Sequence, residues 1–527
     1  MSVFFAFNFY KQNSPKGSAM NRLLLRNFIL STIVCSAPFL SVNSFADNSE
    51  YEQWLKQTKT EFQNYLDEND KAFIGFLNKK WKEVEVEKPV ARDPAPKPLD
   101  IPIAKPVVVI KQTEIEKTDT PITEEEIIKP VIIKPVVIVS PPVIIEEKPV
   151  TEEKPVIKKD FNLRTVKFDF FGEEISIEYH KKFKQNFRSS ISNKSIASYW
   201  EQLATQPHKE IIDQLLENSQ SLQLNDWGTA LLFDQFSREL QGSNQRNQSS
   251  RQLTSWFLLV KAGFNARIAY NDQVFLLMPS KQQLFSTTYF TLDNQRYYSV
   301  SLNEKEMKPG KVFTYSGKHL DGQRNLDFSE PNKFTANKHQ IKRDLSFSYN
   351  NEEFKIDVSY PRDMVNYFKT FPQLDLKNYF SAGMPQETGY NLLTQLKPIV
   401  EGQSETEAVN RLLRFVQTAF EYKTDDDQFR QENYLFPLET LHYPYSDCED
   451  RAALFAWLTE SLLKLDVVIL DFPGHIATAV KFSNPVQGDN WELNGKRYTV
   501  ADPTYVNANV GMTMPQYKGK TPKLMAF

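Results

Sequence analysis

The stretch Ser446-Asp-Cys-Glu-Asp-Arg-Ala-Ala-Leu-Phe455 joins a polar start to a run of small and apolar residues. This pattern predicts a helix that begins at Cys448 and continues to Leu463. The unpaired backbone N–H groups at a helix start favour a thiolate and can also bind an oxyanion. The stretch therefore predicts a cysteine nucleophile at the N-terminus of a helix.

Two later stretches supply the groups that a thiol nucleophile needs. Pro473-Gly-His-Ile-Ala-Thr-Ala479 places His475 at the start of an expected strand, and Tyr498-Thr-Val-Ala-Asp-Pro-Thr-Tyr505 places Asp502 directly after another strand. A thiol needs a base that takes its proton, and the base needs a third group that fixes its tautomer. On adjacent antiparallel strands the two side chains would meet. We therefore expect a catalytic triad of Cys448, His475 and Asp502.

These three stretches, in this order, resemble the motifs of the transglutaminase-like superfamily, over roughly residues 387–517. The resemblance implies an α+β, papain-like domain in which Cys448 attacks a carboxamide or peptide carbonyl and His475 relays the proton. Members of the superfamily are crosslinking enzymes, peptidases or deamidating enzymes, and some are inactive. Two departures affect the substrate-facing surface: Ser446 stands where many members have glycine, and no tryptophan follows His475.

Other polar residues near the nucleophile have simpler interpretations. Asp447, Glu449 and Asp450 are expected to stabilise the helix N-terminus, and their charges would oppose thiolate formation. His442 is an alternative base, but nothing in the sequence orients it. A lone cysteine without a Cys-x-x-Cys pair is a weak basis for a zinc site, and no calcium-loop signature is present. We expect neither a metal nor a cofactor.

The oxyanion donors are less well defined by the sequence. The backbone N–H of Cys448 is one candidate donor, because it lies at the expected helix start. Tyr443 and Tyr445 are candidates for a second donor, since both precede the cysteine closely. No further side chain is assigned to this role.

The N-terminus has the pattern of an export signal that starts at Met20. A basic stretch and the apolar run Phe28–Leu40 precede the small-x-small sequence Ser44-Phe-Ala46. The run is shorter than the roughly 20 residues of a membrane-spanning helix. We therefore expect residues 1–46 to be cleaved, the mature chain to lack a transmembrane segment, and the protein to be periplasmic or secreted. Cys448 would then be an unpaired cysteine in an oxidising compartment.

Two further segments precede the expected domains. Residues 47–84 carry aromatic and aliphatic residues at helical spacing and predict an amphipathic helix. Its apolar face, over residues 50–84, would pack on itself as a hairpin, on a second copy or on a partner protein. Residues 85–160 are rich in Pro, Val, Ile, Lys and Glu. They predict an extended, polyproline-like linker without a specific partner.

An internal repeat follows the linker. Phe168-Asp-Phe-Phe-Gly-Glu-Glu-Ile-Ser-Ile-Glu-Tyr179 and Phe347-Ser-Tyr-Asn-Asn-Glu-Glu-Phe-Lys-Ile-Asp-Val358 share their apolar alternation and a central Glu-Glu, and each predicts a β-hairpin. Helices and then strands are expected after both hairpins, which predicts two copies of one fold. We assign residues 331–527 to the catalytic transglutaminase-like domain and residues 161–330 to a degenerate copy. An unrelated α+β domain is the alternative for the first copy.

The first copy lacks the triad. The positions near those of the cysteine, histidine and aspartate are Asn247–Trp256, Phe275 or Leu276, and Ser301. The first copy is therefore expected to serve packing or recognition.

The charge balance narrows the class of substrate. The chain of 527 residues has 63 Lys and Arg against 66 Asp and Glu, so it lacks the basic surface that nucleic acids require. The sequence predicts an exported thiol-dependent amide hydrolase or acyltransferase that acts on protein or peptidoglycan-peptide amides. Whether water or an amine reaches the acyl-enzyme decides between hydrolysis and transfer. A catalytically silent scaffold that keeps the fold for binding is the alternative.

Overall fold

The computed structural model describes residues 68–92, 97–105, 161–302 and 310–527. The expected signal peptide, the first part of the N-terminal helix and most of the linker lie outside these ranges. The described residues belong to one compact unit that mixes helices with antiparallel sheets, so the α+β class is confirmed. None of the helices in the described ranges is both long and apolar enough to cross a membrane.

The first half begins with the predicted hairpin of β2 (Leu163–Phe170) and β3 (Glu173–His180). Phe171 and Gly172 form its turn with positive φ angles of 48° and 90°. The helices that follow are α2 (Asn193–Ala204), α3 (Lys209–Ser221), α4 (Asp226–Gln241) and α5 (Gln248–Lys261). The sheet of this half has the order β1-β8-β4-β5-β7-β6. Its strands are β1 (Lys82–Val84), β4 (Arg267–Tyr270), β5 (Val274–Met278), β6 (Tyr289–Leu292), β7 (Gln295–Ser299) and β8 (Val312–Thr314).

The second half begins with the corresponding hairpin, β9 (Gln340–Tyr349) and β10 (Glu352–Pro361). Its helices include α6 (Arg362–Phe368), α7 (Leu376–Ser381), α8 (Gln386–Val400), α9 (Glu405–Thr418) and α12 (Cys448–Leu463). Its sheet has the order β15-β16-β14-β13-β17. The strands are β13 (Val467–Phe472), β14 (His475–Val480), β15 (Asn490–Leu493), β16 (Lys496–Ala501) and β17 (Lys523–Met525).

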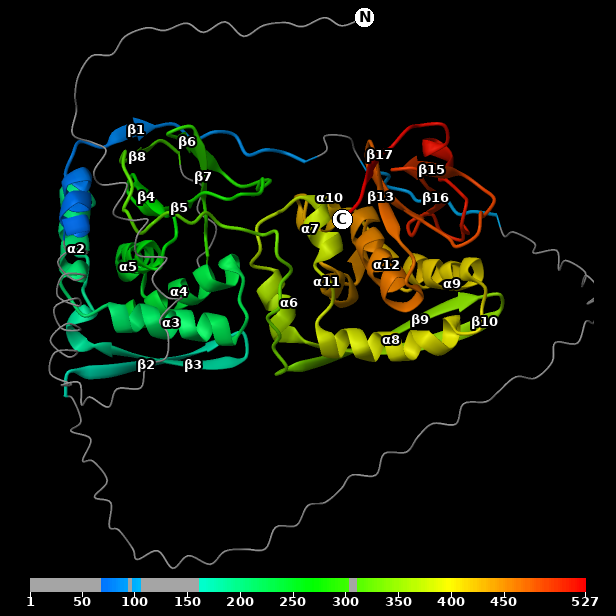
Figure 1. Ribbon diagram of the computed structural model, residues 1–527, viewed down its shortest axis with the longest axis horizontal. Coiled ribbons are helices and arrows are strands. Elements are labelled where there is room, and N and C mark those ends of the chain that lie inside the picture. The colour runs from blue at the N-terminus through cyan, green and yellow to red at the C-terminus, as the bar shows by residue number, and fades with distance from the viewer. Residues whose placement is uncertain (1–67, 93–96, 106–160, 303–309) are drawn as a thin grey trace, which may run out of the picture. The chain divides into compact units, whose positions relative to one another are not determined.

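The two halves have the same order of elements. In each half the hairpin is followed by helices, the last of which before the main strands of the sheet is α5 or α12 (Figure 1). The sheet orders β8-β4-β5-β7-β6 and β17-β13-β14-β16-β15 correspond strand by strand along the chain. All strand pairs in both sheets are antiparallel. The two halves thus share the order of their elements, each beginning with one of the two hairpins.

The halves differ in the connection that leads into α5 or α12. In the first half, residues 242–247 join α4 to α5. In the second half, residues 419–447 join α9 to α12, and we call them the 419–447 insert. The insert contains β11 (Glu421–Tyr422), α10 (Asp425–Phe429), α11 (Pro437–His442) and β12 (Tyr445–Ser446).

Helix α12 forms the centre of the second half. It is buried on most sides, with Ala452, Leu454, Phe455 and Leu458 almost fully enclosed, and it packs against α7, α9, α11 and β14. A helix with apolar residues around most of its circumference must be covered on all sides to be stable. This packing fixes the position of its first residue, Cys448.

The described part of the N-terminal helix packs on the first half of the same chain. Residues 68–77 are helical, and Phe73, Leu77 and Trp81 are buried. The ring of Phe73 lies 4.7 Å from that of Trp200, and the following strand β1 pairs with β8. For these residues the partner of the apolar face is therefore the neighbouring domain.

Part of the expected linker also contacts the folded halves. The Glu87 N–H donates to the Tyr289 carbonyl at 3.0 Å, and the Ala104 N–H donates to the Val506 carbonyl at 2.8 Å. The Arg92 guanidinium lies 3.4 Å above the centre of the Tyr434 ring. The structure thus differs from the expectation of a partner-free spacer over residues 85–92 and 97–105. Proline excludes helix and sheet interiors, but it leaves an extended chain free to dock.

Candidate active site

His475 and Asp502 meet across two adjacent strands. His475 begins β14 after a turn at Gly474, which has a φ of 76°, and Asp502 directly follows β16. Strands β14 and β16 pair in antiparallel register, with Thr478 opposite Ala501. The Nε2 atom of His475 lies 2.9 Å from Oδ2 of Asp502, and both side chains are buried. The strand geometry thus brings together two of the three predicted residues, as the sequence pattern implies.

The surroundings of this pair hold it in one orientation. The Asp502 Oδ1 atom accepts the backbone N–H groups of Thr504 and Tyr505 at 2.9 and 3.2 Å. The ring of Tyr517 stacks on the His475 ring with a centroid distance of 4.8 Å. The Nδ1 atom of His475 is buried and has no hydrogen-bond partner among the described residues. One nitrogen of the imidazole is therefore held by a carboxylate, and the other remains available.

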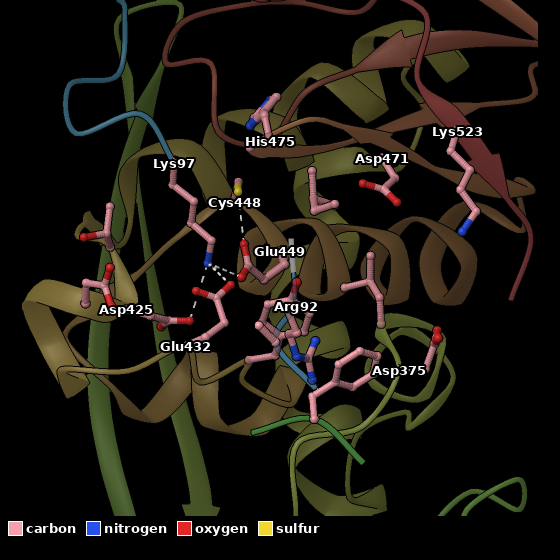
Figure 2. A pocket seen from close by; sticks show the side chains of 18 of the residues that line it. Arg92, Lys97, Asp375, Asp425, Glu432, Cys448, Glu449, Asp471, His475 and Lys523 are labelled. Carbon is pink, nitrogen blue, oxygen red and sulfur yellow. Dashed lines mark hydrogen bonds and ion pairs between the residues drawn. The ribbon is translucent and has the colours of Figure 1, made fainter. Parts of the chain in front are cut away.

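Cys448 lies at the first position of α12, as the sequence predicts, and its side chain is buried. It lines a cavity of about 550 Å³ together with His475, Glu449 and Lys97. Figure 2 shows the side chains of Cys448 and His475 among those that line this cavity. The volume is in the range typical of ligand sites. The predicted nucleophile and base thus line one cavity.

The thiol is hydrogen-bonded to a neighbouring carboxylate. The Cys448 Sγ–H donates to Oε2 of Glu449 at 3.0 Å. Burial, followed by the charges of Glu449 and Asp447, raises the pKa of the Cys448 thiol well above its ordinary value. The expectation that these acids oppose thiolate formation therefore agrees with the electrostatics. In this conformation the sulfur is a protonated thiol directed towards Glu449.

A lysine from the expected linker balances the negative charge of these acidic side chains. Lys97 Nζ lies 2.6 Å from Oδ2 of Asp447 and 2.9 Å from Oε1 of Glu432, and it also contacts Glu449. Its distance from Oδ2 of Asp425 is 3.5 Å. Burial alone would lower the pKa of Lys97, but the charges of Glu449 and Asp447 outweigh it and raise this pKa. Four carboxylates thus surround one ammonium group, and Figure 2 labels three of them, Asp425, Glu432 and Glu449.

The acids themselves are strongly perturbed. Burial, followed by the charge of Asp447, raises the pKa of Asp425 to about 9. Burial, followed by the charge of Glu449, raises the pKa of Asp447 to about 7. Asp450, which accepts the backbone N–H groups of Leu435 and Asp447, also has a raised pKa, because it is buried and lies near Asp447. A clustering of perturbed groups in a cavity is typical of functional sites.

Arg451 fixes the backbone around the nucleophile. Its side chain is buried, and Nε donates to the Ser446 Oγ at 3.1 Å. The terminal nitrogens donate to the carbonyls of Gln417 and Phe420 at 3.4 and 2.8 Å. Arg451 thus ties the start of α12 to the end of α9, and this contact occupies the side chain of Ser446.

The structure places the other candidate residues away from the cavity. His442 Nδ1 lies 3.3 Å from the Tyr360 hydroxyl, and its ring packs on Tyr443. The described residues that line the Cys448 cavity do not include His442, Tyr443 or Tyr445. The alternative base and the two tyrosine oxyanion candidates thus do not line the cavity that Cys448 and His475 line. The Cys448 backbone N–H is the oxyanion candidate that remains.

The first half carries no triad at the corresponding places. Helix α5 begins at Gln248, strand β5 begins at Val274 and strand β7 ends at Ser299. None of these three residues is a cysteine, a histidine or an aspartate. The absence of Cys, His and Asp agrees with the sequence comparison of the two halves.

Sequence reasoning did not find the cation of the site. Lys97 lies among many lysines of a proline-rich stretch, and no spacing distinguishes it from its neighbours. Asp425 and Glu432 lie in the 419–447 insert, which has no counterpart in the first half and so appears in no repeat. Tyr517 follows Asp502 by a loop and carries no motif. These four residues reach the site through tertiary packing alone.

Comparison with known proteins adds no relative. No family model, no curated protein and no solved structure matches this chain.

Proposed function

We propose that this protein is an exported, thiol-dependent amide hydrolase or acyltransferase of the transglutaminase-like type, acting on protein or peptide amides. One observation carries the proposal: His475 contacts Asp502 through Nε2, and its Nδ1 has no partner among the described residues, in the cavity that Cys448 also lines. This division of roles is what a general base needs. The three sequence motifs and the order of elements support a papain-like core.

The proposed reaction follows from these positions. His475 Nδ1 takes the Cys448 proton, and the sulfur attacks the carbonyl carbon of the amide, which forms a C–S bond and an oxyanion. The Cys448 backbone N–H binds that oxyanion at the start of α12. The imidazolium returns its proton to the nitrogen as the C–N bond breaks and the amine leaves. Water or a second amine then attacks the thioester, which restores the thiol.

The contact between Cys448 and Glu449 defines the resting state. The thiol donates to Glu449 at 3.0 Å, so the sulfur must turn from Glu449 towards His475 before the proton is transferred. This step keeps the cysteine protonated when no substrate occupies the cavity. A protonated thiol reacts slowly with oxidants, since the thiolate is the reactive form. Such protection suits an unpaired cysteine in an oxidising compartment.

The labelling rate of Cys448 tests the proposal. In the wild type, iodoacetamide is expected to modify Cys448 at neutral pH, because His475 accepts the proton. After His475→Ala the Cys448 thiol must lose its proton without this base. Because the pKa of the thiol is raised, the labelling rate should then rise only at pH values above the ordinary pKa of a thiol. We expect a loss of about tenfold or more at pH 7, measured by intact-protein mass against time.

Cys448→Ser is the control that identifies the labelled residue, and His442→Ala is the matched control for loss of a histidine outside the cavity. His442→Ala should label at the wild-type rate. Equal rates and equal pH profiles for wild type and His475→Ala would refute the proposal that His475 accepts the proton of Cys448. That result would favour a catalytically silent scaffold.

A further inference from the structure

The strongest feature that the proposed reaction leaves unused is the ammonium group of Lys97. Carboxylate oxygens of Asp425, Asp447 and Glu449 lie within 4.8 Å of one another, and all three side chains are buried. Their mutual repulsion in a low dielectric requires a cation. Lys97 supplies it, and its side chain is only 14 % exposed. The negative charge of the cluster is therefore balanced by Lys97, which lies in the expected linker and, by sequence, belongs to neither half.

The cluster is joined directly to the nucleophile. Lys97 contacts Oε1 of Glu449, and Oε2 of the same carboxylate accepts the Cys448 thiol. Asp447, the second contact of Lys97, immediately precedes Cys448 and caps the helix α12. A displacement of the ammonium group would therefore change both neighbours of the cysteine. Oδ1 of Asp447 is buried without a hydrogen-bond partner among the described residues.

The cluster belongs to the half that carries the cysteine. Asp425 and Glu432 lie in the 419–447 insert, whereas the first half joins α4 to α5 by residues 242–247. The half without a triad therefore lacks the segment that surrounds Lys97. The carboxylates that hold Lys97 therefore occur only in the half that has the cysteine, and they are not part of the structure that the two halves share.

Residues 97–105 are attached to the site at three places. The Tyr422 hydroxyl of the insert donates to the Pro98 carbonyl at 2.8 Å. The Ala104 N–H donates to the carbonyl of Val506, in the loop that follows Asp502, and Ile103 forms a parallel bridge with Val506. With the Lys97 ion pairs, the segment thus contacts the insert, the start of α12 and the loop after Asp502.

We propose that Lys97 is a positioning residue of this site, and that residues 97–105 are an integral part of the catalytic half. The proposal rests on the proposed function for its catalytic meaning. Lys97 neutralises Asp447 and Glu449, which keeps both side chains beside Cys448 without blocking loss of the thiol proton. Lys97 and Leu99 line the cavity together with Cys448 and His475, so this segment forms part of the cavity wall.

Several titratable groups face the ammonium and enter any pH dependence. The carboxylates come from the 419–447 insert, which includes α10, and from the start of α12. Two tyrosines and the thiol complete the set. They are Asp425, Glu432, Asp447, Glu449, Tyr422, Tyr434 and Cys448. Lys97→Met removes the charge and keeps most of the side-chain volume, so it isolates the electrostatic effect on this set.

The test measures the pH profile of Cys448 alkylation by iodoacetamide in the full chain. Lys97→Met is expected to move the profile to higher pH and to slow labelling at pH 7 by on the order of tenfold, because uncompensated carboxylates oppose the thiolate. Lys97→Arg keeps the charge and should retain most of the wild-type rate. Lys105→Met, an exposed lysine of the same segment, is the matched control and should leave the profile unchanged.

A double variant guards against a folding defect. Lys97→Met with Glu449→Gln removes one charge of each sign, so it should recover part of the loss caused by Lys97→Met alone. A wild-type profile for Lys97→Met would overturn the proposal. Faster labelling of Lys97→Met would also overturn it, since the segment would then be an inhibitor.

The same measurement in a His475→Ala background separates this proposal from the proposed function. If the imidazole plays no part, wild type and His475→Ala share one profile, but Lys97→Met still shifts the thiol ionisation in both. If Lys97 plays no part, the difference between wild type and His475→Ala persists and Lys97→Met changes neither profile.

Discussion

Asp502→Asn is expected to lower the rate of acyl transfer to Cys448 by about 10³-fold or more, while the fold is retained. The carboxylate accepts the His475 Nε2–H at 2.9 Å, which leaves Nδ1 unprotonated for the thiol. An asparagine amide can donate to Nε2 instead, and the imidazole proton then moves to Nδ1, where it prevents base action. The rate with p-nitrophenyl acetate at neutral pH, followed by release of p-nitrophenol, measures the loss.

Asp502→Ala separates catalysis from folding. The Oδ1 atom of Asp502 accepts the backbone N–H groups of Thr504 and Tyr505, and an asparagine oxygen can keep these two contacts. Alanine loses them, so Asp502→Ala should lower the melting temperature as well as the rate. If Asp502→Asn reacts as fast as the wild type, the carboxylate does not orient His475.

Arg451→Met is expected to destabilise the protein by about 3–5 kcal/mol. The buried guanidinium donates to Ser446 Oγ and to the carbonyls of Gln417 and Phe420. Methionine fills much of the volume but leaves these buried acceptors without donors, at roughly 1–3 kcal/mol for each unsatisfied group. It also removes a positive charge near Asp447 and Asp450. Urea unfolding followed by circular dichroism measures the difference.

Arg451→Lys is the matched control for the charge. A single ammonium group cannot reach three acceptors in different directions, so the lysine variant should be intermediate in stability. Arg411→Lys, which changes a partly exposed arginine on α9, should have a much smaller effect. If Arg451→Met unfolds at the same urea concentration as the wild type, these contacts contribute little to the stability of the protein.

The sequence predicts the elements that follow local rules. The two hairpins come from alternating apolar residues around Phe171-Gly172 and Asn350-Asn351, which adopt positive φ angles at the turns. Helix α12 and the strands β13, β14 and β16 come from apolar periodicity and from the Pro473-Gly474 turn. Because β14 and β16 pair directly in the sheet, the contact between His475 and Asp502 follows from the places of the two residues at a strand start and after a strand end.

Contacts between distant segments are outside the reach of such rules. Lys97 lies 350 residues before Asp447 along the chain, and an ion pair of this separation leaves no periodic signal. Proline-rich composition indicates an extended chain but does not say whether that chain docks, as Ala104 does on Val506. Similarly, the hydrogen bond from Cys448 to Glu449 depends on rotamers, which sequence spacing does not determine.

On the proposed function, Cys448 forms a covalent acyl-enzyme with His475 as its base. The most direct measurement is intact-protein and peptide mass spectrometry of the full chain during reaction with p-nitrophenyl acetate. In the wild type we expect a rapid burst in which one acetyl group appears on Cys448, and we expect no such burst in His475→Ala or Cys448→Ser. Acetylation of Cys448 at the same slow rate in wild type and His475→Ala would contradict it.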